Sequence, residues 1–153
     1  MIKNDVKIGQ YCVIEEGVKI GHGVEIGNYV LLKKGTVIGD DCFIDSYVKT
    51  SGDCIIGDNS VIRFNSIIAR KVTIGKNVFI SPNVSTIYFN HNINPTLGIN
   101  ISDNVFIGTG AIINHGIQIA EGVIIGAGSF VNKDCNCQGA TYIGSPAIPK
   151  LDK

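Results

Sequence analysis

Three histidines are the side chains of this 153-residue chain best suited to accept a proton near neutral pH: His22, His91 and His115. A neutral imidazole, with a pKa of about 6.5, can take a proton from a reacting hydroxyl or amine, so each is a candidate general base. His91 differs from the others because it lies in a segment rich in asparagine and aromatic residues, 87–98. Whether any of them acts depends on the elements that hold it in place.

An aliphatic residue recurs at every sixth position over almost the whole chain. Steps of six from Ile8 lead to Thr86, and the same rhythm runs from Ile101 to Ile143. Of these 22 positions, 19 are Ile, Leu or Val, and the exceptions are Thr50, Thr86 and Cys137. A period of six fits neither a helix nor a simple alternating strand, and it predicts a hexapeptide-repeat parallel β-helix.

The residues between the aliphatic positions complete this pattern. The residue two before each aliphatic one is usually compact, so the pair describes a short strand with two inward side chains. Gly, Asn, Asp, Lys and Glu fill the remaining positions, as tight corners require. Three consecutive hexapeptides, each with a strand and a corner, make one coil. The sequence therefore predicts an all-β domain over residues 1–153, with about seven triangular coils.

The rhythm breaks once. Thr86 ends the first run of aliphatic positions, and the step from it to Ile107 is not a multiple of six. A segment of about 87–99 is therefore expected to leave the coils as a loop. Loops on a rigid scaffold often carry function, which favours a functional role over a solubilising surface insert.

The five cysteines fall on inward positions of the repeat. The compact position holds Cys12, Cys42, Cys54 and Cys135, and the bulky position holds Cys137. Free cysteine is a good small core residue, so we expect packing rather than metal binding or disulfide formation. Cys135 and Cys137 are also too close in sequence for a Cys-x-x-Cys metal pair.

Charge excludes some classes of partner. The chain has 13 basic and 13 acidic residues and no basic run, which argues against a nucleic-acid or membrane surface. It has no leader and no long apolar stretch, so we expect a cytoplasmic protein.

The C-terminal third carries a more specific pattern. Residues 122–134 read GVIIGAGSFVNKD, and residues 142–150 read YIGSPAIPK. Together with the repeat, they resemble the hexapeptide acyltransferase superfamily over about residues 6–149. The resemblance implies a left-handed parallel β-helix and homotrimers with active sites between subunits. It also implies a CoA site; the residues that match it are Gly108, Gly126, Ala127, Gly128, Gly144 and Pro146, with Lys133 and Lys150 near the CoA phosphates.

The same resemblance implies an acetyl-CoA-dependent acetyltransferase acting on a sugar, in particular an amino sugar or a nucleotide-linked sugar for surface polysaccharide. In several branches the loop carries the catalytic histidine, which assigns His91 as the base. His115 is the second candidate, because other branches place their histidine at its offset within a hexapeptide. The resemblance offers four residues as acceptor contacts: Asn83, Tyr88, Asn90 and Asn92.

Alternatives remain at this stage. In one branch that acetylates nucleotide-linked amino sugars, the bound substrates deliver the proton, and His91 would then be dispensable. A γ-class carbonic anhydrase needs three zinc-binding histidines, two of them in a His-x4-His pair, and the three histidines here lack that spacing. A non-catalytic scaffold is the third possibility. We expect no metal cofactor.

Overall fold

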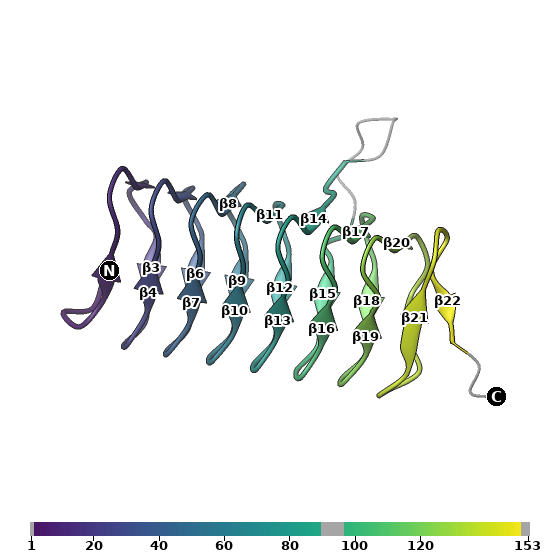
Figure 1. Cartoon of the computed structure of the whole chain (residues 1–153). Coiled ribbons are helices and arrows are strands. Elements are labelled where there is room, and N and C mark those ends of the chain that lie inside the picture. The colour runs from purple at the N-terminus through teal and green to yellow at the C-terminus, as the bar shows by residue number, and fades with distance from the viewer. Residues whose placement is uncertain (1, 90–96, 151–153) are drawn as a thin grey trace.

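The chain winds into a triangular prism of short parallel strands (Figure 1). The computed structural model describes residues 2–89 and 97–150. The winding is a left-handed β-helix of about seven turns, as the repeat and the resemblance predict. Strands one coil apart pair in register, so that each residue lies beside its equivalent three hexapeptides later, as Lys7 does beside Glu25.

The strands form three sheets, one on each side of the prism. Sheet 1 contains β1 (Lys7–Ile8), β4 (Glu25–Ile26), β7 (Phe43–Ile44), β10 (Val61–Ile62), β13 (Phe79–Ile80), β16 (Phe106–Ile107), β19 (Ile124–Ile125), β21 (Thr141–Ile143) and β22 (Ile148–Pro149). Sheet 2 contains β2 (Val13–Ile14), β5 (Leu31–Leu32), β8 (Lys49–Thr50), β11 (Ile67–Ile68), β14 (Ser85–Thr86), β17 (Ile112–Ile113) and β20 (Phe130–Val131). Sheet 3 contains β3 (Lys19–Ile20), β6 (Val37–Ile38), β9 (Ile55–Ile56), β12 (Thr73–Ile74), β15 (Asn100–Ile101) and β18 (Gln118–Ile119).

The second residue of almost every strand points into the prism and forms the core. Ile44, Ile62 and Ile80, for example, stack in successive coils of sheet 1 and are fully buried. The compact positions lie between these stacks, and Cys42 and Cys54 are buried there as predicted, whereas Cys12 is half-buried. Cys135 is also buried, but it pairs with Ile119 and so takes the bulky position that was expected for Cys137. Stacking identical aliphatic side chains removes them from water, which is the main stabilising force of this repeat.

Thr50 and Thr86, the two threonines at aliphatic positions of the repeat, have the same structural role in sheet 2. Thr50 Oγ1 accepts a hydrogen bond of 3.0 Å from the Lys33 amide. Thr86 Oγ1 accepts one of 2.7 Å from the Ala69 amide, one coil earlier. Each hydroxyl therefore caps a corner amide, part-buried at Lys33 and buried at Ala69, that an aliphatic side chain would leave without this partner.

The last coil differs from the prediction. Cys137 and Ile143 were expected to point inward, but both are exposed, and the buried side chain there is Tyr142. Tyr142 pairs with Ile125, the position that the period assigns to Ile143, so this coil is one residue short. The chain then reverses, and β22 pairs antiparallel with β21. The shortened coil moves the frame by one residue and turns the side chain of Ile143 outward.

The break in the rhythm lies where the loop was expected, between β14 and β15. The Ile87 amide still bonds to the Ile113 carbonyl at 2.9 Å, and Ile99 is buried again. Gly98 marks the return, because a Cβ built on it would lie 2.0 Å from the Lys71 carbonyl oxygen. Only glycine fits against that backbone.

Candidate active site

The expected site residues in the described part of the chain gather mainly at two corners that border sheet 2. Corner 1–2, where the chain passes from sheet 1 to sheet 2, holds the glycine-rich segments 108–110 and 126–128 and, one coil before them, Asn83. The turn 144–146 between β21 and β22 lies beside this corner, where the Gly144 carbonyl accepts from the Phe130 amide at 3.0 Å. Corner 2–3, on the other side of sheet 2, holds Tyr88, His115 and Lys133. Lys150 lies apart from both, after β22, where its amide bonds to the Thr141 carbonyl at 2.7 Å.

Corner 1–2 changes character along the prism. In the first coils, a side chain of the next coil caps the second amide of the corner. Asn28 Oδ1 accepts from the Gln10 amide at 2.7 Å, and Ser46 Oγ accepts from the Asn28 amide at 3.0 Å. In the fourth, sixth and seventh coils the equivalent residues have no such partner: Phe64, Thr109 and Ala127 donate no amide hydrogen bond to any residue within 2–89 and 97–150. The fifth coil has Pro82 at this position, which has no amide hydrogen.

The cap on the Thr109 amide is absent because of the side chain at the same position one coil later. That residue is Ala127, whose methyl group cannot accept a hydrogen bond. The amides of Thr109 and Ala127 therefore remain available on an exposed corner for an external acceptor. In retrospect, the sequence contains a signal for these free amides: the second position of corner 1–2 is Asn28 or Ser46 in the early coils and Ala127 in a later one.

The glycines of this corner are explained in part by packing alone. A Cβ on Gly108 would lie 2.5 Å from the Ala127 amide nitrogen, and one on Gly126 would lie 2.7 Å from the Ile143 side chain. The fold itself therefore requires Gly108, which lies against backbone, whereas a side chain at position 126 would require the exposed Ile143 side chain to move. Gly128 instead faces open space, and its φ of 66° explains its identity.

Within the part of the chain that the structure describes, the contacts of Asn83 are structural. Its backbone has a φ of 60°, which asparagine tolerates, and its side-chain oxygen accepts a hydrogen bond of 2.9 Å from Asn65 Nδ2 in the coil before. This contact extends the corner as an asparagine ladder.

Corner 2–3 holds the base of the loop and the second candidate histidine. Tyr88 contacts Phe89 edge to face, with ring centroids 4.4 Å apart, and Lys71 Nζ lies 5.9 Å from the Tyr88 ring centre. His115 is half-buried in the next coil, beside Gly116, which faces the Leu97 carbonyl at the end of the loop. Three of the expected residues, Asn90, His91 and Asn92, lie outside the described residues.

An apolar hollow adjoins the base of the loop on its N-terminal side. It has a volume of about 380 Å³. Its lining comes from three successive coils of sheet 2 and corner 2–3: Ser51, Ile67, Ala69, Arg70, Thr86, Ile87, Tyr88 and Phe89. Of these residues, the sequence analysis proposed only Tyr88 as a site residue. A hexapeptide period does not show which side chains of one coil lie beside the loop of another.

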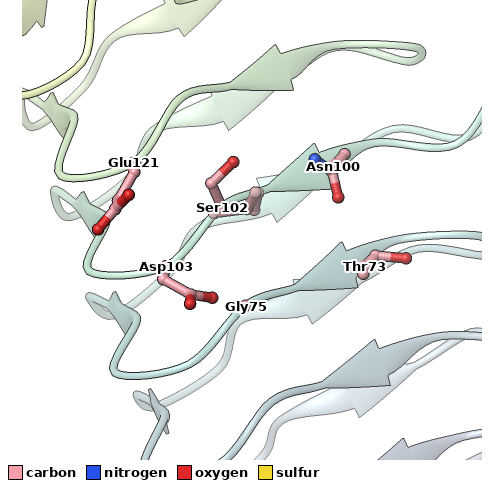
Figure 2. Close-up of a pocket in the computed structure, with 7 residues that line it drawn as sticks. Thr73, Gly75, Asn100, Ser102, Asp103 and Glu121 are labelled. Atoms are coloured by element: carbon pink, nitrogen blue, oxygen red, sulfur yellow. The ribbon is translucent and has the colours of Figure 1, made fainter.

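A second hollow, of about 410 Å³, lies on sheet 3 and contains none of the expected site residues (Figure 2). Its carboxylates are engaged in holding corners together. Asp103 Oδ1 accepts from the Lys76 amide at 2.7 Å, and Glu121 accepts from Asn104 and Gln138 at 3.1 and 3.3 Å. These bonds give the acidic groups a structural role.

The two described histidines are far apart. His22 lies in the first coil, between sheets 3 and 1, where its Nδ1 is 3.3 Å from Asp5, and His115 lies in the sixth coil at corner 2–3. No cluster of three or more His, Cys, Asp or Glu that could hold a metal occurs among residues 2–89 and 97–150. The same residues contain no helix long and apolar enough to cross a membrane.

Comparison with known proteins identifies the repeat. The family model of the bacterial transferase hexapeptide, with six repeats, matches residues 1–34, 35–70 and 98–133. The chain belongs to this hexapeptide transferase family. No curated protein matches it significantly.

Several solved structures of hexapeptide proteins are similar to the chain. Galactoside acetyltransferase in complex with coenzyme A is 29% identical, with a TM-score of 0.66, over 81% of this chain and 66% of that one. The acetyltransferase domain of PglB from Neisseria gonorrhoeae is 19% identical, with a TM-score of 0.63, over 98% and 57%. PerB from Caulobacter crescentus, solved with CoA and GDP-perosamine, is 20% identical, with a TM-score of 0.54, over 95% and 58%. The chain thus spans 57–66% of the length of these three proteins.

Proposed function

We propose that the protein is an acetyl-CoA-dependent acetyltransferase whose acceptor is a sugar, in particular an amino sugar or a nucleotide-linked sugar. The row of uncapped amides at corner 1–2 carries this proposal. The pantetheine arm of CoA contains two amide groups, whose carbonyls are suitable acceptors for the Thr109 and Ala127 amides. Gly128 and Pro146 would border the same arm, and Lys133 and Lys150 would meet the phosphates.

The transfer needs a base and a donor to the developing oxyanion. His91 would remove the proton from the acceptor amine or hydroxyl, which then attacks the thioester carbonyl of acetyl-CoA and releases CoA as a thiol. A backbone amide would stabilise the tetrahedral oxyanion. No covalent enzyme intermediate is required. If the substrates deliver the proton themselves, His91 is dispensable, and Asn83, Asn90 or Asn92 would position the acceptor amine.

The separation of the two corners supports an oligomer. His115 and Gly110 lie at opposite ends of one strand of sheet 2, so the sheet separates the two corners by about 16 Å. A base must come within about 3 Å of its proton, directly or through one water. The loop of one copy would therefore act beside corner 1–2 of a second copy, consistent with a homotrimer. Use of acetyl-CoA would place this assembly in the cytoplasm.

Calorimetric titration with acetyl-CoA tests the proposal. The wild-type protein should bind stoichiometrically. Ala127→Asn should weaken binding about 10-fold, because the new side chain can cap the Thr109 amide as Asn28 caps that of Gln10. Ser46→Asn, at the same corner but in the third coil, is the matched control and should bind as the wild type does. Absence of binding by the wild-type protein would refute the proposed function.

A further inference from the structure

Four aromatic side chains form a row along corner 1–2 in the first four coils. Tyr11, Tyr29 and Tyr47 occupy the same position of successive coils and stack on one another, with ring centroids 5.1 and 5.0 Å apart. Phe64 continues the row edge to face, with its ring centre 5.3 Å from that of Tyr47. At the spacing of stacked strands, this tyrosine ribbon is about 14 Å long.

The backbone of the three tyrosines is in a conformation that tyrosine rarely adopts. Their φ angles are 57°, 57° and 63°, in the left-handed region that bulky residues avoid. The same position of the corner holds Asn65 and Asn83 in the next two coils, and asparagine tolerates this φ. Strained residues persist where they serve a function, which suggests that the exposed rings have a use beyond folding.

Much of the ribbon remains open to a ligand. Tyr29 has a ring on either side and is still 47% exposed, and Tyr11, at the end of the row, is 72% exposed. The hydroxyls of Tyr11, Tyr29 and Tyr47 make no hydrogen bond to any other group among residues 2–89 and 97–150. The ribbon therefore combines apolar ring surface with free hydroxyls, a combination suited to ligands that are partly apolar and partly hydrated.

The charge of the corner selects among such ligands. Segments 9–12 and 27–30, which carry Tyr11 and Tyr29, contain no charged residue. The corner of the next two coils holds Asp45 and Arg63, and they pair with each other at 3.1 Å. A ligand that carries phosphate would thus find no free cation in these segments.

A neutral glycan fits this surface because it needs no charged partner. The C–H faces of its sugar rings can pack against aromatic rings, and its hydroxyls can exchange hydrogen bonds with phenol groups. Successive pyranose units of an extended glycan also advance by a step similar to the spacing of the tyrosine rings.

We propose that the tyrosine ribbon binds an extended neutral glycan that lies along the prism, with about one sugar unit per coil. The ribbon is a binding surface in the first four coils, and none of its side chains is assigned to the acyl donor or to the base. The inference therefore goes beyond the proposed transferase and does not depend on acetyl transfer.

NMR of labelled tyrosine rings tests the proposal. The chain has five tyrosines, so protein with 13C-labelled tyrosine gives few ring signals. In titrations with maltopentaose, cellopentaose and laminaripentaose, the signals of Tyr11, Tyr29 and Tyr47 should move with at least one glycan, while those of Tyr88 and Tyr142 stay in place. Glucose should bind at least about 10-fold more weakly, because a single unit contacts one ring. Unchanged ribbon signals with all three pentasaccharides, or equal affinity for glucose, would overturn the inference.

Two variants separate the ribbon from general effects. Tyr29→Asn interrupts the row with the residue that this position holds as Asn65 and Asn83, so it should weaken binding of the responding pentasaccharide at least about 10-fold. Phe79→Thr is the matched control, because it removes an exposed ring that stacks on Phe106 at 5.5 Å on the face of sheet 1, and it should bind as the wild type does. Wild-type affinity in Tyr29→Asn, or equal loss in both variants, would refute the assignment.

Stability distinguishes a binding role from a folding role of the rings. Tyr29→Asn loses stacking but relieves backbone strain, so its Tm should stay within about 4 °C of the wild-type value. A Tm lowered by more than about 10 °C would assign the rings to folding and overturn the proposal. Tyr29→Phe keeps the ring and should bind within about 5-fold of the wild type, since only one hydroxyl is removed.

A second copy of this chain is the rival occupant of the ribbon. Sedimentation velocity should give the same oligomeric state for the wild-type and Tyr29→Asn proteins. A smaller assembly in the variant would make the ribbon a subunit contact and overturn the inference. Glycan binding by a wild-type protein that does not bind acetyl-CoA would uphold the ribbon and refute the transferase, so the two proposals fail separately.

Discussion

Thr86 links the stability of the prism to the base of the loop, and its hydroxyl can be tested directly. The side chain is 6% exposed, and its oxygen is the acceptor of the Ala69 amide, which is itself buried. Thr86→Val keeps the shape of the side chain but leaves the Ala69 N–H without an acceptor. The cost of a buried unsatisfied amide is about 1–3 kcal/mol.

For a chain of this length, about 1 kcal/mol corresponds to a change in Tm of about 2–4 °C, so Thr86→Val should lower Tm by about 2–12 °C. Thermal unfolding followed by circular dichroism measures the change, and hydrogen exchange of the Ala69 amide should accelerate in the variant. Thr73→Val is the matched control, because Thr73 points outward from sheet 3 and its replacement should change stability by less than about 0.5 kcal/mol. Equal Tm values for the wild-type and Thr86→Val proteins would show that the bond to Ala69 contributes nothing, and the reasoning would fail.

Other outcomes follow from the same structure. His91→Ala should lower kcat by about 100-fold with the fold intact, measured by steady-state kinetics; an unchanged kcat would favour proton delivery by the substrates. Exposed Cys137 should react rapidly with a thiol reagent at pH 8, whereas Cys135 should react slowly, because burial raises the pKa of its thiol to about 11 and keeps it protonated. Equal labelling rates would contradict the assigned core. Ile62→Asp should prevent folding, because Ile62 is fully buried and an unpaired charge there is costly; Ile55→Asp, on the exposed face, should remain folded and soluble, as circular dichroism would show.

The period of six was sufficient to predict the coils, because each inward position repeats the same environment one coil later. It also located the loop, since Thr86 and Ile107 are out of phase. It failed at the last coil, because a coil shortened by one residue carries no signal in the residue types, and Tyr142 replaces the expected side chain. The period describes a coil with two equivalent neighbours, and the last coil has only one.

The candidate site was only partly predictable for a different reason. Gly126 and Ala127 could be found by resemblance, but the period alone gives them the same meaning as any small corner residue. The availability of the Thr109 amide is a property of two coils together, because the capping atom would have to come from Ala127. The apolar hollow likewise depends on Ile67 and Phe89 meeting across coils, which requires the three-dimensional stacking.

The exit at Ile87 and the return at Gly98 make this corner a natural place for variation in chain length. Ile87 and Ile99, which follows Gly98, both remain in the hydrogen-bonded frame, so segments of different length can connect them while the strands on either side keep their register. Doubling the length of such a connection costs only about 0.6 kcal/mol of closure entropy. A scaffold of this kind can therefore exchange one loop for another, by evolution or by grafting, while corner 1–2 remains as it is.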